Sequence, residues 1–285
     1  MISTTRWIGC SEKGNNLAFY DADDAAIYYE QSGEGKPAVM LHGYALNGLM
    51  WSFQKESVTA NHKMIAVDLR GFGQSSCNKR WSSDIMAEDI AGLIESLDLH
   101  DCTIVGFSMS GPVAVKLALG LPQRIGKLAL VSSILPSTGR ARNEKERNTQ
   151  RKERDLLTLR GVNAWADAMG IRKGPLVGNI FQRNPESKEV WEQMLSRHNP
   201  DFLGCMMEAR ESQSENIDWR ARLSEIKQQT MIIVGAQDAR FIDASKYMAR
   251  TIPGARLEII SGAGHIVNLE RPDEFNRIFR EFLDT

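Results

Sequence analysis

The hexapeptide GFSMSG, residues 106–111, indicates the fold of this 285-residue chain. It follows the apolar run CTIV and precedes the helix-like stretch PVAVKLAL. A turn from strand to helix can hold its central residue in a strained conformation above a sheet, provided that the neighbouring residues are small. Gly106 stands two residues before Ser108, and Ser110 and Gly111 follow it. This spacing predicts that Ser108 Oγ stands free at the carboxyl end of a central strand.

Short apolar runs on both sides of this turn alternate with segments of helical period. Runs of this length are typical of strands buried on both faces of a parallel sheet. They are PAVMLHG (37–43), KMIAVDLRG (63–71), CTIVGFS (102–108), KLALVSS (127–133), TMIIVGAQD (230–238) and ARLEIISG (255–262). Residues 17–33 predict two further strands, and residues 82–99 and 271–285 predict amphipathic helices. The alternation predicts an α/β fold with a doubly wound, mostly parallel sheet.

The alternation stops between Leu135 and about Arg222, where helix-forming, heavily charged sequence replaces the strand runs. We therefore expect a core domain of residues 1–135 and 223–285, with a helical cap, or lid, of residues 136–222 inserted in it. From residue 137 to 160 this segment carries eight basic and four acidic side chains. Such a stretch could bind an anionic substrate or only solvate an exposed helix, and we favour the solvated helix.

The composition narrows the function classes. The chain is 42% hydrophobic and 25% charged, with a formal net charge of -1, which gives no support to a nucleic-acid partner. The cysteines Cys10, Cys77, Cys102 and Cys205 have no metal-ligand spacing, so we expect reduced thiols and no metal site. No run reaches the ~18 apolar residues of a membrane span, and the first residues do not resemble a signal peptide. We expect a cytoplasmic protein without a membrane partner, and a homodimer is left open.

A serine hydroxyl needs a base to become a nucleophile, and the chain has five histidines. His62 and His100 precede strands and so belong to the opposite end of the sheet. His198 is in the charged cap, where we expect it on the surface. His42 ends a strand and is assigned to shaping the loop that follows. His265, in the glycine-flanked loop SGAGHIVNLERP, follows a strand and is our predicted base.

The base needs an acid, and the reaction needs hydrogen-bond donors for a developing oxyanion. A carboxylate on the second ring nitrogen fixes the tautomer of His265, and Asp238 ends the preceding strand. Asp243 is the rival acid, but we expect it to cap the next helix. The backbone N–H of Met109 and the backbone N–H of Tyr44 are the predicted oxyanion-hole donors.

Together these motifs resemble the α/β-hydrolase fold over nearly the whole chain. The stretches LHGYALNGLMW, DLRGFGQSS, GFSMSG, VGAQD and GAGHIVNLERP stand in the order and approximate spacing of that family. The chain order Ser108, Asp238, His265 is also the family's order. Haloalkane dehalogenases and epoxide hydrolases resemble this fold but use aspartate at the elbow, where this chain has serine. Ser110 replaces the more usual glycine, and Asp68 is expected to be structural, as is Arg70.

The resemblance implies acyl transfer to water through an acyl-enzyme on Ser108, with no metal and no organic cofactor. We expect the substrate to be a small, partly apolar carboxylic ester or lactone, bound in part by Phe107 and Trp165. A carbon–carbon bond hydrolase of aromatic degradation and a signalling or binding protein with a slow triad stay open as alternatives. Large apolar cap residues could line the pocket or form the cap's own core, which we favour: Trp165, Met169, Phe181, Trp191, Met206 and Met207.

Overall fold

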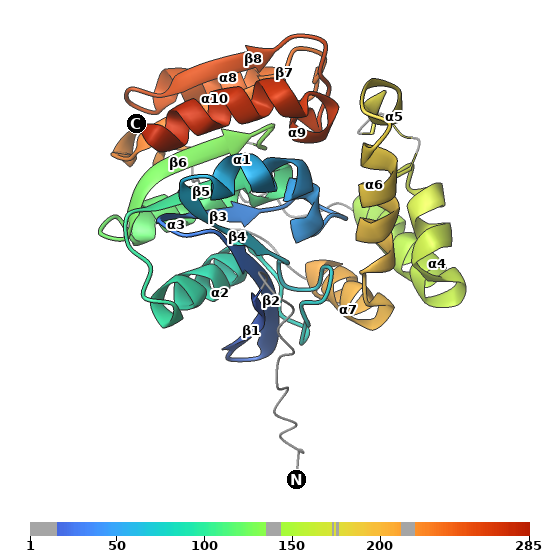
Figure 1. The fold of residues 1–285 in the computed structure, drawn as a ribbon. Helices are drawn as coiled ribbons and strands as arrows, with labels where there is room; N and C mark the ends of the chain where they lie inside the picture. The colour runs from blue at the N-terminus through green and yellow to red at the C-terminus, as the bar shows by residue number, and fades with distance from the viewer. Residues whose placement is uncertain (1–15, 135–143, 173, 175–176, 212–219) are drawn as a thin grey trace.

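A sheet lies at the centre of the molecule, with helices on both faces (Figure 1). The computed structural model describes residues 16–134, 144–172, 174, 177–211 and 220–285. Within these ranges eight strands form one sheet in the order β1-β2-β4-β3-β5-β6-β7-β8. The strands are β1 Asn16–Ala22, β2 Ala25–Ser32, β3 Lys36–Leu41, β4 His62–Val67, β5 Cys102–Phe107, β6 Ile125–Val131, β7 Gln229–Gly235 and β8 Arg256–Ile260. The predicted strands and the mostly parallel sheet are confirmed.

The direction of the strands decides where loops can meet. Strand β2 is antiparallel to β1 and β4, whereas β3 to β8 pair in parallel. In the central register Leu41 lies opposite Gly106, and Phe107 lies opposite Val131. All parallel strands therefore end at one edge of the sheet, and the loops that follow β3, β5, β7 and β8 lie together there.

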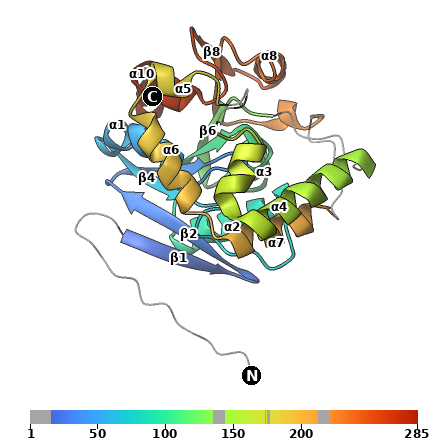
Figure 2. The same cartoon turned by 90° about the vertical axis from the view of Figure 1, so that its right-hand side faces the viewer.

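Helices cover both faces of the sheet. They are α1 Lys55–Thr59, α2 Ser83–Ser96, α3 Gly111–Gly120, α8 Ile242–Thr251, α9 Val267–Glu270 and α10 Pro272–Asp284. Helix α1 packs against α10, and α2 packs against α3 (Figures 1 and 2). Ser82 is the N-cap of α2, because its Oγ accepts a hydrogen bond from the N–H of Ile85 at 3.1 Å. Asp243 does not cap α8, which begins at Ile242, so that Asp243 lies in the first turn.

Between β6 and β7 the described residues form helices and turns and no strand, and we refer to this segment as the cap, whose domain bounds stay a prediction. It contains α4 Glu144–Ala168, α5 Ile180–Arg183, α6 Ser187–Ser196 and α7 Pro200–Glu211. Helix α4 packs against α6 and α7 and is interrupted at Gly161, whose φ of 76° is readily adopted only by glycine. Helix α5 contacts α9 of the core. The expected domain boundary at 135–136 falls outside the described residues, as does Cys10.

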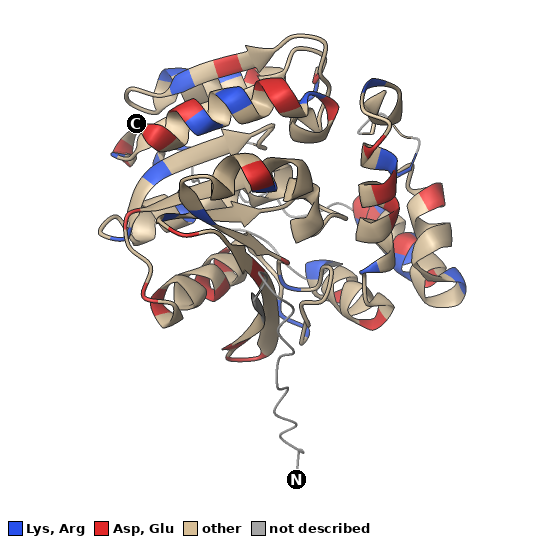
Figure 3. Cartoon of the chain, viewed as in Figure 1, with Lys and Arg blue, Asp and Glu red and all other residues tan. Residues whose placement is uncertain are grey.

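Charges of both signs are mixed along the helices of the core and of the cap (Figure 3). The central parallel strands are apolar, and their residues Val39, Ile65 and Val105 are fully buried. In the described ranges none of the helices combines the length and the apolar character that crossing a membrane requires.

Candidate active site

Strand β5 ends in a tight turn that carries the predicted nucleophile. Ser108 begins a 3-10 helix, Ser108–Ser110, that leads directly into α3. Its φ of +51° lies in the left-handed region, which costs a non-glycine residue roughly 1–3 kcal/mol. A Cβ on Gly106 would lie 2.8 Å from the Cβ of Ala114, and one on Gly111 would overlap Ser133 Oγ. Small residues on both sides of Ser108 therefore allow the strand and the helix to approach.

Ser110 fastens this turn to the neighbouring strand. Its hydroxyl accepts a hydrogen bond from the N–H of Phe107 at 2.9 Å. It also lies 3.0 Å from the carbonyl oxygens of Leu41 and Phe107, to either of which it can donate. The side chain is fully buried, so these partners replace water. Serine in place of the more usual glycine thus adds a link between the ends of β5 and β3.

The structure brings together the three residues that the sequence assigned to catalysis. His265 Nε2 lies 3.0 Å from Ser108 Oγ, and His265 Nδ1 lies 2.8 Å from Asp238 Oδ2. All three side chains are nearly enclosed, with exposed fractions of 9% for Ser108, 6% for His265 and 4% for Asp238. With the Nδ1 proton donated to the carboxylate, Nε2 can accept the serine proton. The arrangement is therefore able to generate a nucleophilic alkoxide.

Two aromatic rings hold the imidazole of His265. Phe241 stacks on it with ring centroids 4.4 Å apart and ring planes 24° apart. Phe107 approaches it at 5.1 Å with a 50° tilt. Sequence reasoning missed Phe241, although its position three residues after Asp238, on the same turn, was a usable signal. The rings restrict the orientation of the imidazole and keep water from its face.

The loop after β3 approaches the same turn. His42 donates from Nδ1 to the carbonyl of Gly43 at 2.7 Å and accepts the N–H of Leu69 at Nε2, at 2.8 Å. Burial lowers the pKa of His42 to about 3, so the ring is neutral and shapes the loop as expected. A Cβ on Gly43 would lie 2.8 Å from the Phe107 ring, which shows how closely the loop packs. Tyr44 follows, and its oxyanion role stays a prediction.

A cavity of about 540 Å³ opens in front of Ser108 and His265. This size is typical of pockets for small organic molecules. Its apolar lining residues include Tyr44, Leu46, Phe107, Met169, Ile171, Val177 and Trp191. Its polar lining residues include Asn179, Arg183, Gln237, Arg240 and Glu270. Residues 144–160 of α4 are absent from the lining, in keeping with a solvated helix.

The large residues of the cap divide between the cavity and the cap's own core. Met169 and Trp191 of the cap line the cavity, and so does Phe107 of β5, as predicted. Trp165 does not, and this corrects its assignment to substrate binding. Its side chain is fully buried and packs edge-on against Tyr44, with ring centroids 6.5 Å apart, and Tyr44 rather than Trp165 lines the cavity. Phe181 also stays out of the lining, as do Met206 and Met207.

His198 is not the surface residue expected from its charged surroundings. It is buried between α6 and α7, where Nδ1 accepts the N–H of Gly73 at 2.9 Å and Nε2 donates to the carbonyl of Ala45 at 3.1 Å. Burial lowers the pKa of His198 to about 4. The prediction that His198 lies on the surface was wrong, because the chain between α6 and α7 packs on two loops of the core. One loop contains Gly73, and the other contains Ala45.

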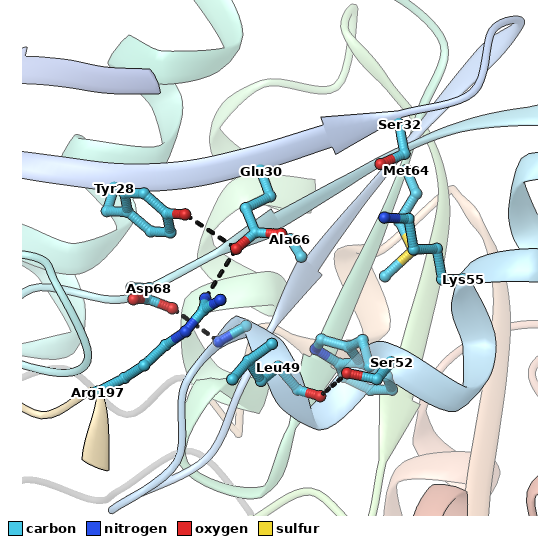
Figure 4. A pocket seen from close by; sticks show the side chains of 12 residues that line it. Tyr28, Glu30, Ser32, Leu49, Ser52, Lys55, Met64, Ala66, Asp68 and Arg197 are labelled. Carbon is cyan, nitrogen blue, oxygen red and sulfur yellow. Dashed lines mark hydrogen bonds and ion pairs between the residues drawn. The ribbon is translucent and has the colours of Figure 1, made fainter. Parts of the chain in front are cut away.

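A second, much smaller hollow of about 40 Å³ is lined by Arg197, the residue before His198 (Figure 4). There Arg197 of the cap pairs with Glu30 of β2 at 2.7 Å, and the Tyr28 hydroxyl donates to the same carboxylate at 2.9 Å. Asp68 accepts the N–H of Gly48 at 2.7 Å, and burial raises its pKa to about 6. The hollow is too small for an organic substrate, and Asp68 has the structural role expected for it.

Arg70 also has the structural role expected from the sequence. Its guanidinium pairs with Asp89 of α2 and with Asp24, and the side chain is almost completely buried. No grouping of three or more His, Cys, Asp or Glu side chains suited to a metal ion occurs among the described residues.

Comparison with known proteins gives one family. The model of the family described as alpha/beta hydrolase fold matches residues 36–272, which is most of the chain. The 2-hydroxy-6-oxo-6-phenylhexa-2,4-dienoate hydrolase of Comamonas testosteroni is 27% identical to the chain, over 96% of this chain and 97% of its own length.

Two solved structures are similar over almost their entire length. A thermophilic esterase from Thermogutta terrifontis has a TM-score of 0.78 and 26% identity, covering 95% of this chain and 98% of its own. An enzyme that degrades N-acyl homoserine lactones has a TM-score of 0.73 and 27% identity, covering 93% of this chain and all of its own.

Proposed function

Because the chain belongs to the α/β-hydrolase family and its relatives are enzymes, we propose that it is a serine hydrolase that cleaves a small, partly apolar carboxylic ester or lactone. The single observation that carries the proposal is the position of His265, within hydrogen-bonding distance of Ser108 Oγ on one side and of Asp238 on the other. A nucleophile, its base and an orienting acid are what acyl transfer needs.

The reaction proceeds through an acyl-enzyme. Ser108 Oγ attacks the substrate carbonyl while His265 Nε2 takes the hydroxyl proton, and Asp238 stabilises the imidazolium that forms. The N–H groups of Met109 and Tyr44 donate to the oxyanion, each lowering the barrier by roughly 3–4 kcal/mol. His265 then gives its proton to the leaving alcohol. In the second half a water molecule, deprotonated by His265, attacks the acyl group and releases the acid.

Cavity size and lining support a small substrate with an apolar part. The space of about 540 Å³ suits a molecule of drug size or below, and its lining includes the apolar side chains of Phe107 and Trp191. The similar solved structures are described as an esterase and as a lactone-degrading enzyme, and this supports an ester or lactone bond.

Carbon–carbon bond hydrolysis is a second candidate, favoured by the relative from Comamonas testosteroni and its similarity across almost both chains. That reaction takes a vinylogous diketone acid, whose carboxylate could pair with Arg183 or Arg240, both of which line the cavity. The same serine and histidine would serve, so the two candidates differ in substrate and not in catalytic residues.

One panel separates the candidates. The purified protein is tested with 4-nitrophenyl acetate and butyrate, with γ- and δ-lactones and with a vinylogous diketone acid, and a fluorophosphonate label is mapped by mass spectrometry. We expect turnover of esters or lactones and labelling of Ser108, with Ser108→Ala inactive and unlabelled. Preferential turnover of the diketone acid would favour the second candidate. Absence of turnover together with an unlabelled Ser108 would contradict both.

A further inference from the structure

An ion pair joins the cap to the core beside the histidine loop. Arg183 ends helix α5 of the cap, and its guanidinium contacts the carboxylate of Glu270, the last residue of α9. The Glu270 side chain is completely buried, and that of Arg183 is 18% exposed. Both residues also line the cavity in front of Ser108. The pair therefore belongs to the same cavity as the proposed catalytic residues.

Glu270 holds the backbone next to His265. Its Oε2 accepts the N–H of Gly264 at 3.0 Å, and Gly264 directly precedes the histidine. The fit is close, because a Cβ on Gly264 would lie 2.8 Å from the other carboxylate oxygen. Any shift of the Glu270 carboxylate is therefore passed to the peptide that positions the imidazole.

Arg183 also reaches the loop that carries the acid. A second guanidinium nitrogen donates to the side chain of Gln237, the residue before Asp238. The N–H of Gln237 in turn donates to the carbonyl of Ala263 at 2.8 Å, which ties the acid loop to the histidine loop. One cap side chain thus contacts both loops whose relative position sets the distance from Asp238 to His265.

Because Glu270 is buried, its hydrogen bond to the N–H of Gly264 depends on the cap. A buried carboxylate that loses its cationic partner carries a large desolvation cost, which drives it to move toward water. Such a movement changes its hold on Gly264. Only the cap supplies the guanidinium that this carboxylate contacts in the described residues.

We propose that Arg183 and Glu270 are positioning residues for His265, through which the docked cap sets the geometry of the catalytic base. This inference rests on the proposed serine-hydrolase function. A misplacement of about 1 Å at a catalytic group can cost on the order of 10²-fold in rate. Loss of the pair should therefore lower kcat and the reactivity of Ser108, with little change in KM for a small ester.

The test uses Arg183→Met, Arg183→Lys and the double variant Arg183→Met/Glu270→Leu, with kcat and KM for 4-nitrophenyl acetate, the rate of fluorophosphonate labelling, and Tm. Arg172→Met is the matched control, since Arg172 pairs with Glu192 and Asp167 inside the cap and does not line the cavity. The double variant removes the buried charge together with its partner, and such apolar replacements are often neutral for stability.

We expect Arg183→Met to lower kcat and the labelling rate by about 10- to 100-fold and to lower Tm. The double variant should recover Tm but not kcat, and Arg183→Lys should retain most of the rate. Arg172→Met should match the unsubstituted protein. The inference would be overturned if the double variant recovered kcat together with Tm, or if Arg183→Met changed KM alone. In that case the labelling of Ser108 in the unsubstituted protein would still support the proposed function. An unlabelled Ser108 in the unsubstituted protein would instead reject the proposed function itself.

Discussion

Phe241 lies flat against the imidazole of His265, with 4.4 Å between ring centroids. The ring comes from the turn that also carries Asp238, so one short segment supplies both the acid that orients the base and the surface on which it rests. Protonation during catalysis makes the imidazole cationic, and an aromatic face stabilises such a cation. Phe241 is absent from the cavity lining, so it does not touch the reacting atoms of the substrate. We expect it to contribute to the rate through its contact with the imidazole.

Replacement of Phe241 by leucine should slow Ser108 labelling by a fluorophosphonate about 2- to 10-fold, since stacked aromatic pairs contribute roughly 0.5–1.5 kcal/mol beyond their buried area. Phe241→Tyr keeps the ring and serves as the control, with a rate close to that of the unsubstituted protein. Equal rates for the leucine variant and the unsubstituted protein would show that the stacked ring has no part in placing the base.

Ser108 combines reactivity with a backbone conformation that favours glycine. Both Ser108→Ala and Ser108→Gly should lose hydrolysis by about 10⁴- to 10⁶-fold, because residues of a triad act as one unit. The two variants should differ in stability. At a φ of +51° alanine retains the steric strain and glycine releases it, so the glycine variant should be more stable by about 1 kcal/mol in urea unfolding. Equal unfolding midpoints would argue against strain at this residue.

Ser110 offers a test of the departure from the more usual glycine. Ser110→Ala removes the partner of the Phe107 N–H and one bond to a carbonyl, and should lower the free energy of unfolding by about 1–3 kcal/mol. Ser96→Ala is the control, because that hydroxyl donates only to Leu93 at the end of α2 and should change stability by less than about 0.5 kcal/mol. Similar losses for both variants would remove the special role of Ser110.

Strand positions and the meeting of Ser108, Asp238 and His265 could be predicted because parallel strands leave little freedom. Each apolar run fixes a strand, each strand end fixes a loop, and every such loop lies at the same edge of the sheet. The distances of 2.8 and 3.0 Å on either side of His265 are the outcome of that topology. Small residues around Ser108 then identify which loop carries the nucleophile.

The contacts of the cap could not be predicted in the same way. Arg183 and Glu270 are 87 positions apart, and their pairing depends on how α5 docks against α9, which no local pattern records. For the same reason Trp165 was assigned to substrate and His198 to the surface. Helix α4 gives no clear amphipathic face, so its sequence does not indicate which side is covered.

The buried histidines make stability depend on pH. Burial lowers the pKa of His42 from 6.5 to about 3 and that of His198 from 6.5 to about 4. Below about pH 6.5 the unfolded chain therefore binds protons at both rings that the folded protein excludes, so the stability that these two rings contribute falls as the pH falls. Asp68, whose folded pKa is raised from 3.8 to about 6, acts in the opposite direction between these two values, as do Asp89 and Glu153, whose pKa values are raised by burial.

The slope of the free energy of unfolding against pH, measured by urea unfolding from pH 7 down to pH 4, reports the sum of these opposing contributions. His198→Asn should make this slope less positive, because the amide oxygen can replace Nδ1 as acceptor for the Gly73 N–H and does not titrate in this range. At pH 7, where neither ring is protonated in either state to a large extent, the variant should lose only about 1–2 kcal/mol for the bond to Ala45. A slope unchanged by His198→Asn would mean that this ring is protonated in the folded protein, and the docking of the cap on the loops of Gly73 and Ala45 would then need a different hydrogen-bonding arrangement.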